Sequence, residues 1–505
     1  MPLKVLRKEI EAEREIGHKY LQVLSRAEAL VPGAGREAIE PLLWDASAAI
    51  VRADVQNDRV VLDGTLSCQA VYRQGEEPTL RALSAKSTVS QVAELTGAQP
   101  GMLCRVQAVV ENVDARYENG HMVFLVSLGL HVWVLKLENL EVIDQIEDGA
   151  EVEARFRDLP LVKLAAEANE TAVLTERVEL PRALDARATL MDWGSVQIDS
   201  SEPDLGGVRV KGRAMIETLV ASGVEGKPGV VVKYPIEFDK LIELPEWLCG
   251  EVSVLPSIRS IRTQLEPGDE EEDGTLLLQA DVYFEIAANL RERTQALEDA
   301  YATSGAELKL ETRRIAICTD RKCVCSAEVA RGTAPLGEGA PAVGSVIAVR
   351  AIPNIAEITT QGGKGRISGL IEATVLYMPV GSDRPVSTSA ELPFTLDVPQ
   401  ELDADDMVCI GVTSAEANAL MSDRLEMKIG LNLYCERRVC EERSLVTGME
   451  AGESTPRRPG YIVCWPESGE DAWDVGKRYG VPESAVLEGA PDGKLRSGSP
   501  LVLRI

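Results

Sequence analysis

The sequence has 505 residues, and its 53 Lys and Arg against 81 Asp and Glu give a formal net charge of −28 at pH 7. This balance excludes a nucleic-acid-binding protein, which needs clustered cations, and disfavours adsorption to anionic lipid. With 45% hydrophobic residues and roughly 100–200 residues per domain, the chain can form three or four domains with separate cores.

We find neither the pattern of a membrane span nor that of a signal peptide in the sequence. No stretch approaches the ~20 apolar residues of a membrane span, and the N-terminal stretch MPLKVLRKEIEAEREIGHKYL has no apolar run of signal-peptide length. We therefore expect no membrane span and a cytoplasmic protein. Its ten cysteines are then expected to be mostly free thiols.

Residues 1–30 are predicted to form an N-terminal helix. Apolar side chains recur there at roughly helical spacing between charged residues, which is typical of an amphipathic helix. They are Leu6, Ile10, Ile16, Tyr20, Leu21 and Leu24. The segment Leu30–Gly33, with the sequence LVPG, ends the predicted helix.

One stretch occurs three times, as Val60–Tyr72, Val208–Val220 and Gly365–Tyr377. The copies align on Gly64, Gly212 and Gly369, which are 148 and 157 residues apart. Around these glycines apolar and polar residues alternate, which predicts a long strand with one buried face. A glycine inside a strand usually marks a bulge or a close backbone approach. The repetition predicts one fold present three times.

A hairpin is predicted after each copy. Asn119-Gly120 is a strong signal because both positions of a type I′ turn need positive φ. Asp273-Gly274 and Ser422-Asp423 occupy the corresponding places. Short strands with turn signals favour three β-sandwich-like domains, at residues 31–155, 170–305 and 306–447. Between the first two, Leu161–Glu170 has a helix-like pattern.

Residues 448–458, rich in Gly, Pro, Ser and charge, are predicted to be a linker. Residues 459–505 then predict a small βααβ domain. Its expected elements are a strand at Tyr461–Cys464, helices at Asp471–Tyr479 and Ser484–Glu488, and a closing strand at Leu501–Arg504.

Catalytic and metal-binding patterns are missing from the sequence. It contains no G-x-x-x-x-G-K-[ST] phosphate loop, no H-E-x-x-H and no G-x-S-x-G. Cys318, Cys323 and Cys325 have four and then one residue between them, whereas zinc sites use paired ligands with two to four between. We expect a protein that is not an enzyme and has no cofactor and no metal site.

The last segment resembles a LysM domain. The matching residues are Tyr461-Ile462-Val463, Gly469, Trp473, Val475, Tyr479-Gly480-Val481, Leu487, Leu495 and Leu501–Leu503. The rest of the chain resembles the SPOCS domain of endospore-forming bacteria, through Val31-Pro32, the strand ending at Asp63-Gly64, and Tyr72. SPOCS domains followed by LysM are the arrangement of the SipL-like spore-coat morphogenetic proteins.

The resemblance implies a protein of the mother-cell cytoplasm at the forespore surface. It would dock a SpoIVA-like ATPase of the coat basement layer through the LysM-like domain, with other coat proteins as further partners. The residues expected to bind the partner are Tyr461, Ile462, Trp473, Val475, Lys477, Arg478, Tyr479 and Leu487. Trp473 can be either a core residue or an interface anchor.

The alternative is a LysM protein that binds peptidoglycan or cortex glycan. Glycan-binding LysM domains usually have Gly-Asp-Thr before the first helix and Asn after the second. Here these places hold Gly469-Glu470-Asp471 and Glu488-Gly489. Carboxylates remove hydrogen-bond donors and add a desolvation cost, which favours a protein partner. The sequence leaves open what the three β-domains bind.

Overall fold

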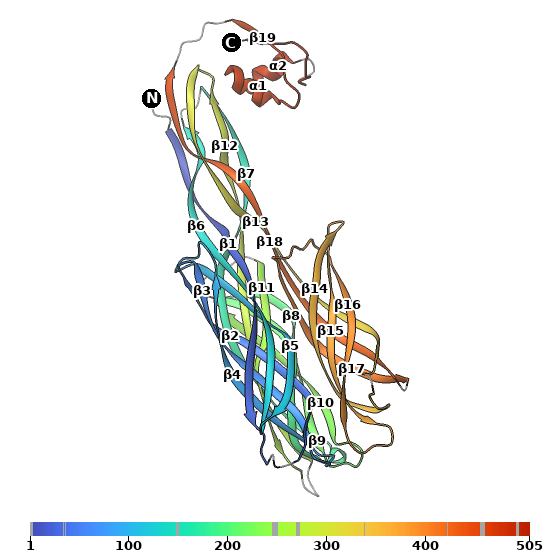
Figure 1. The fold of residues 1–505 in the computed structure, drawn as a ribbon. Helices are drawn as coiled ribbons and strands as arrows, with labels where there is room; N and C mark the ends of the chain where they lie inside the picture. Colours follow the sequence, from blue (N-terminus) through green and yellow to red (C-terminus); the bar gives the residue numbers. More distant parts are fainter. Residues whose placement is uncertain are drawn as a thin grey trace.

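Strands make up almost all of the regular structure, as Figure 1 shows. The structure is a computed structural model that describes residues 4–33, 35, 37–147, 151–244, 251–268, 273–337, 339–421, 423–454, 460–490 and 494–504. The prediction of a mainly β protein is confirmed. No helix among these residues is long and apolar enough to cross a membrane.

The chain forms three successive units of six strands. Unit 1 contains β1 (Lys4–Leu30), β2 (Ile39–Gln56), β3 (Arg59–Gln74), β4 (Leu80–Glu94), β5 (Leu103–Glu118) and β6 (His121–Glu147). Unit 2 contains β7 (Val152–Leu180), a 3-10 turn η1 (Arg182–Leu184), β8 (Ala186–Asp204), β9 (Gly207–Ser222), β10 (Gly229–Glu243), β11 (Glu251–Glu266) and β12 (Gly274–Ala302). Unit 3 contains β13 (Ala306–Pro335), β14 (Val343–Gln361), β15 (Lys364–Pro379), β16 (Val386–Val398), β17 (Met407–Met421) and β18 (Arg424–Ser454).

Each unit has two antiparallel three-stranded sheets. In unit 1 the orders are β2-β3-β4 and β1-β6-β5, and units 2 and 3 repeat this topology with β8-β9-β10 and β7-β12-β11, and with β14-β15-β16 and β13-β18-β17. Buried side chains from both sheets form one core per unit, because alternating strands turn one face inward. The predicted turn at Asn119-Gly120 is present, and both residues have positive φ.

The repeated glycines are sites of close backbone approach. Gly64, Gly212 and Gly369 lie in β3, β9 and β15, each opposite a β-bulge of the preceding strand. A Cβ on Gly64 would lie 2.6 Å from the Ala49 carbonyl oxygen, and on Gly212 or Gly369 it would lie closer still to the equivalent carbonyl. A side chain at these positions would push the two strands apart.

The three units close into a ring with approximate threefold symmetry. Strands β3 and β4 of unit 1 contact β8 of unit 2, β10 of unit 2 contacts β14 of unit 3, and β15 and β16 of unit 3 contact β2 of unit 1. An apolar cluster joins the units at equivalent bulges, with Leu42 and Leu43 from unit 1, Leu190 and Met191 from unit 2, and Ile347 and Ala348 from unit 3. Because the ring is closed, no unit leaves this apolar face unpartnered.

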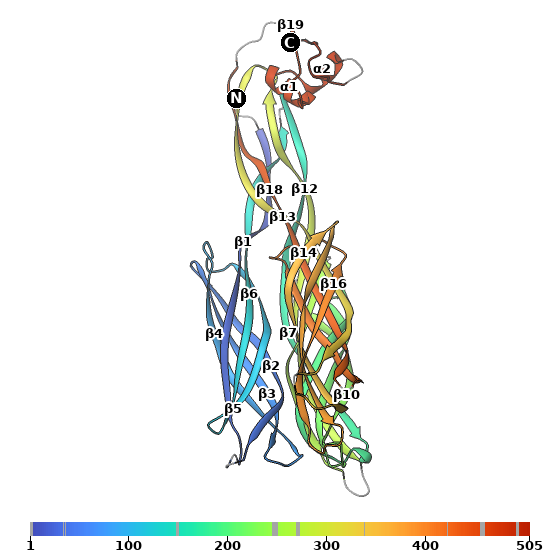
Figure 2. The same ribbon diagram turned by 45° about the vertical axis from the view of Figure 1, so that its right-hand side comes forward.

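Beyond this body, the pairs β1–β6, β7–β12 and β13–β18 continue together as a twisted stalk (Figures 1 and 2). Its interior is apolar, with residues from all three pairs, among them Ile10, Leu140, Leu161, Ala296, Ile317 and Leu445. The stalk carries the C-terminal module at its far end. One antiparallel pair alone is marginally stable in water, so the three pairs depend on one another for burial.

A buried charge network, here called the neck, lies where the stalk joins the body. Arg321 of unit 3 donates to Glu13 of unit 1 at 2.5 Å and to Asn289 of unit 2 at 2.7 Å. Arg105 of unit 1 donates to Glu436 of unit 3 at 2.6 Å. These side chains are almost fully buried, so removing one partner would leave an uncompensated charge. The neck therefore ties all three units together.

The predicted N-terminal helix is wrong, because residues 4–30 are strand β1. A bulge between Glu15 and Gly17 shifts the alternation of side chains along the strand. Before the bulge, Ile10 and Ala12 at even-numbered positions are buried, and after it Val23 and Ala27 at odd-numbered positions are buried. This shift blurs the alternation and mimics helical spacing. Leu161–Glu170 is likewise strand, within β7.

The predicted domain limits remain predictions, although residue 155 lies inside β7 and residue 447 inside β18. Of the predicted linker 448–458, residues 448–454 belong to β18. Residues 455–458 lie outside the described part of the chain.

Candidate functional site

The C-terminal module has the strand–helix–helix–strand order expected from the sequence. It consists of β19 (Tyr461–Cys464), α1 (Ala472–Tyr479), α2 (Glu483–Gly489) and β20 (Leu501–Arg504), with β19 antiparallel to β20. Helix α1 starts at a capping box, in which the Asp471 side chain accepts from the Asp474 N–H, and ends at Gly480 with φ of 61°. These caps fix both ends of a short helix.

Three of the predicted partner-binding residues hold the module together. Val475 is buried in the module core with Cys464, Val486 and Leu503. Ile462 and Tyr479 pack against the same cluster while keeping part of their surface exposed. Burial of Val475 removes it as a contact for any partner.

Trp473 and Lys477 bind the stalk of the same chain. The Trp473 indole N–H donates to Asp299 at 2.9 Å, and Lys477 Nζ donates to both oxygens of that carboxylate at 2.7 and 2.6 Å. The Tyr301 and Trp473 rings pack edge to face with their centroids 4.8 Å apart, and the Arg155 guanidinium lies 4.7 Å from the indole centroid. Trp473 therefore packs against the tip of β7 and β12 of the same chain.

The carboxylates of Glu470 and Asp471, before α1, are paired within the chain. Asp471 accepts from Arg155 at 2.8 Å, and Glu470 forms an ion pair with Arg478. Partial burial raises the pKa of Asp471, but the hydrogen bonds from Arg155 and the Asp474 backbone outweigh this and lower it overall. Arg478, predicted as a partner contact, is thus engaged with its own loop.

The outer face of the β19–β20 sheet is apolar and exposed. Val463 and Val502 lie opposite each other with 52% and 51% of their surface exposed, and Tyr461 is 75% exposed. Trp465, directly after β19, is 56% exposed. We call Tyr461, Val463, Trp465 and Val502 the outer face. Leu487, on α2, is 39% exposed.

Sequence reasoning found only Tyr461 of the outer face. The missing signal is the unbroken apolar run Tyr461–Trp465, YIVCW. In a two-stranded sheet the helices cover one face only, so such a run must leave alternate side chains exposed. Val463 and Trp465 could have been identified from this argument.

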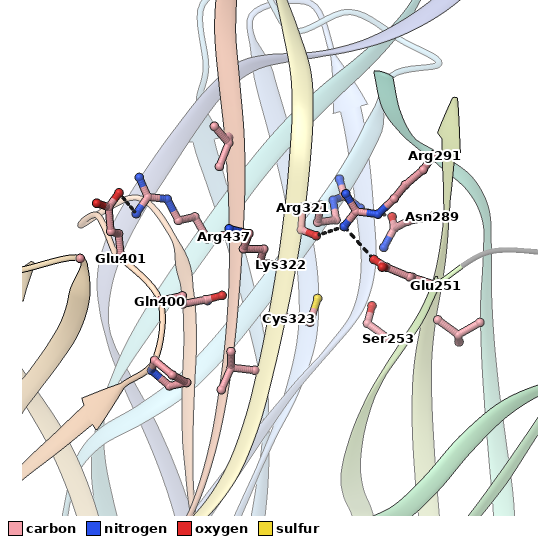
Figure 3. Close-up of a pocket in the computed structure, with 15 residues that line it drawn as sticks. Glu251, Ser253, Asn289, Arg291, Arg321, Lys322, Cys323, Gln400, Glu401 and Arg437 are labelled. Atoms are coloured by element: carbon pink, nitrogen blue, oxygen red, sulfur yellow. Dashed lines mark hydrogen bonds and ion pairs between the residues drawn. The ribbon is translucent and has the colours of Figure 1, made fainter. Parts of the chain in front are cut away.

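A second candidate region is a cavity of about 840 Å³ beside the neck, between units 2 and 3. Figure 3 shows Arg291 reaching Glu251 and the Arg321 carbonyl, and Arg437 reaching Glu401. The Gln400 amide is buried there with no hydrogen-bond partner among the described residues. Arg291 and Arg437 are already paired with the carboxylates of Glu251 and Glu401. Little positive charge therefore remains in the cavity to bind an anion.

One family comparison identifies part of the chain. Residues 39–118 match the family model described as SipL, SPOCS domain. The matched stretch corresponds to β2–β5, and β1 and β6 complete the two sheets of unit 1. Neither the curated proteins nor the solved structures that were compared with the chain match it.

Proposed function

From the SipL-type SPOCS domain at residues 39–118, a domain of sporulation proteins without catalytic activity, we propose that this chain is a non-enzymatic assembly protein of the spore envelope. It docks a SpoIVA-like coat ATPase through its C-terminal LysM-like module. The protein then acts in the mother-cell cytoplasm, at the forespore surface. Other coat proteins are candidates for the three β-units.

The outer face carries this proposal. Three large apolar side chains of this sheet, and Trp465 directly after β19, are each more than half exposed. Contiguous exposed apolar surface of this kind marks an interaction site, and Trp and Tyr are the residue types that dominate binding energies. Arg504, paired with Tyr461 in the sheet, adds a cation to the rim. The interface centre is therefore expected at Trp465 and Val463 rather than at Trp473.

The contact between Trp473, Lys477 and Asp299 gives the module a fixed seat. Because α1 faces the stalk tip, the opposite side of the module, with β19 and β20, remains available. The ring and the stalk then serve as a spacer that holds the docking surface away from the body (Figure 2).

The experiment uses the full chain and purified SpoIVA-like ATPase. Trp465→Glu places a charge in the outer face, and Leu205→Glu is the matched control, since Leu205 is 78% exposed in the β8–β9 turn of unit 2. We expect Trp465→Glu to weaken binding more than tenfold, as for a hot-spot residue, and Leu205→Glu to bind like wild type. Equal binding of all three proteins would overturn the proposal.

A second arm uses insoluble peptidoglycan. Retention of the wild-type chain by peptidoglycan and not by the ATPase would replace the proposal with the glycan-binding alternative. The pairing of Glu470 with Arg478 and of Asp471 with Arg155 favours the protein partner, because a sugar would have to compete with these ion pairs.

A further inference from the structure

Two cysteines face each other across a strand pair above the neck. The antiparallel register of β13 and β18 places Cys318 directly opposite Cys440, and the Cys318 thiol donates to the Asp320 carbonyl at 3.4 Å. Directly opposed residues of antiparallel strands have Cα atoms roughly 4.5–5.5 Å apart. Disulfides need a Cα separation of about 4.4–6.8 Å. The backbone thus already holds the two residues at the Cα spacing of a disulfide.

This arrangement is specific to the one pair. Among the cysteines that the structure describes, every other one lies opposite a different residue type: Cys323 is paired with Glu436, and both Cys325 and Cys409 are paired with Tyr434. Cys68 and Cys464 are buried opposite apolar residues. An oxidant therefore meets a single preformed dithiol in the described part of the chain.

The two thiols differ in access and in acidity. Cys318 is 1% exposed, whereas Cys440 is exposed. The neighbouring Cys318 thiol and the charge of Arg438 lower the pKa of Cys440 despite its partial burial. The neighbouring Cys440 thiol, together with burial, raises the pKa of Cys318. Cys440 is thus the attacking thiolate and Cys318 the resolving thiol, since the thiolate is the reactive form.

We propose that Cys318 and Cys440 are a modification site, a dithiol that a small-molecule disulfide such as glutathione disulfide converts to a cross-strand disulfide. The Cys440 thiolate attacks one sulfur of the small disulfide, forming a mixed disulfide and releasing one small thiolate. Cys318 then gives its proton to solvent or to that thiolate and attacks Cys440 Sγ, releasing the second small thiolate. The protein loses two electrons and two protons, and the small disulfide gains them as two thiols.

The position gives the bond a structural consequence. Near this pair, Arg438 binds Glu15 at 2.7 Å and Arg321 binds Glu13, so β13 and β18 contact β1 of unit 1 here. The neighbouring register shift between Cys318 and Asp320 is an irregular point of the ladder. A disulfide would fasten β13 to β18 at this point, where the stalk leaves the body.

The test incubates the folded full chain with glutathione disulfide or with reduced glutathione, blocks free thiols with an alkylating reagent, and maps the peptides by mass. We expect one linked pair of peptides containing Cys318 and Cys440, two fewer alkylated thiols, and complete reversal by reduced glutathione. Absence of this link, or links between other cysteines in the folded chain, would overturn the proposal.

Three single variants test the assigned roles. Cys318→Ser should accumulate glutathione on Cys440, because the resolving thiol is gone. Cys440→Ser should leave Cys318 unmodified, and Cys323→Ser, the control, should form the Cys318–Cys440 link as wild type does. Equal glutathione labelling of Cys318 and Cys440 in the two Ser variants would contradict the order of attack.

Discussion

Glu436 provides the most quantitative test of the neck. It lies on β18, is 3% exposed, and accepts hydrogen bonds from Arg105 Nη1 at 2.6 Å and from the Tyr434 hydroxyl at 2.8 Å. Arg321 Nε is 3.7 Å from the same carboxylate. Glu436→Gln keeps the shape of the side chain but removes the negative charge that holds the two guanidinium groups of units 1 and 3 together.

The magnitude follows from the pKa of Glu436. Burial by itself raises it, but Arg105 and Arg321 outweigh burial and lower it from 4.5 to about 2. That difference corresponds to about 3 kcal/mol, which agrees with the cost of roughly 3–5 kcal/mol for breaking a buried ion pair. Because the folded pKa is depressed, the stabilisation is fully present above pH 4.5 and is lost as pH falls towards 2. At pH 3 about 1 kcal/mol remains.

The assay is urea unfolding followed by tryptophan fluorescence, at pH 7 and at pH 3. The matched control is Glu441→Gln, on the same strand, whose ion pair with Arg443 is partly exposed and is worth only about 0–1 kcal/mol. We expect a loss of about 3 kcal/mol for Glu436→Gln at pH 7 that shrinks at pH 3. A loss below about 1 kcal/mol, or one that does not change with pH, would show that Glu436 does not stabilise the neck through its charge.

Three further predictions address the repeat, the module seat and a buried acid. Gly369→Ala should lower the thermal midpoint of unfolding, with an overpacking cost of about 1–3 kcal/mol. The reason is that the new Cβ would meet the Asn354 carbonyl and the Phe394 ring. Gly411→Ala is the control and should leave the midpoint unchanged, because a Cβ at Gly411 would enter open space. Equal midpoints would contradict the close approach. Asp299→Ala should release the module by removing the acceptor of Trp473 and Lys477, seen as faster proteolytic cleavage between β18 and β19, with Asp158→Ala as an exposed stalk control. Burial raises the pKa of Asp406 to about 6, against the opposing hydrogen bond from the Asp403 backbone. The charged form of Asp406 therefore destabilises the fold, so Asp406→Asn should raise the thermal midpoint of unfolding at pH 7.5 but not at pH 4. A higher midpoint at pH 4 only would contradict a destabilising carboxylate at this position.

The repeat was predictable because its determinants are local. The alternation around Gly64, Gly212 and Gly369 and the Asn119-Gly120 turn depend on residues close in sequence. The neck was not predictable, since Glu13, Arg105 and Arg321 come from three separate regions of a chain that contains 81 acids and 53 basic residues. Strand β1 was missed for a different reason, because a single bulge at Ile16 inverts the alternation of its side chains.

The candidate site also combines features that depend on neighbouring residues with contacts between residues far apart in the sequence. Trp473 stood out in the sequence as an aromatic residue of α1, but its partner Asp299 is 174 residues away. No spacing rule could identify that contact. Tyr461, Val463 and Trp465 of the outer face were within reach of the sequence, because the five consecutive apolar residues Tyr461–Trp465 cannot all be covered in a two-stranded sheet.

Hydrogen exchange of the full chain, with and without the SpoIVA-like ATPase, would locate the docking surface. We expect binding to slow amide exchange in Tyr461–Cys464 and Leu501–Arg504, while exchange in α1, which packs on the stalk, stays unchanged. Slower exchange confined to the strands of the three units, with β19 and β20 unaffected, would contradict the assignment of the outer face as the docking surface.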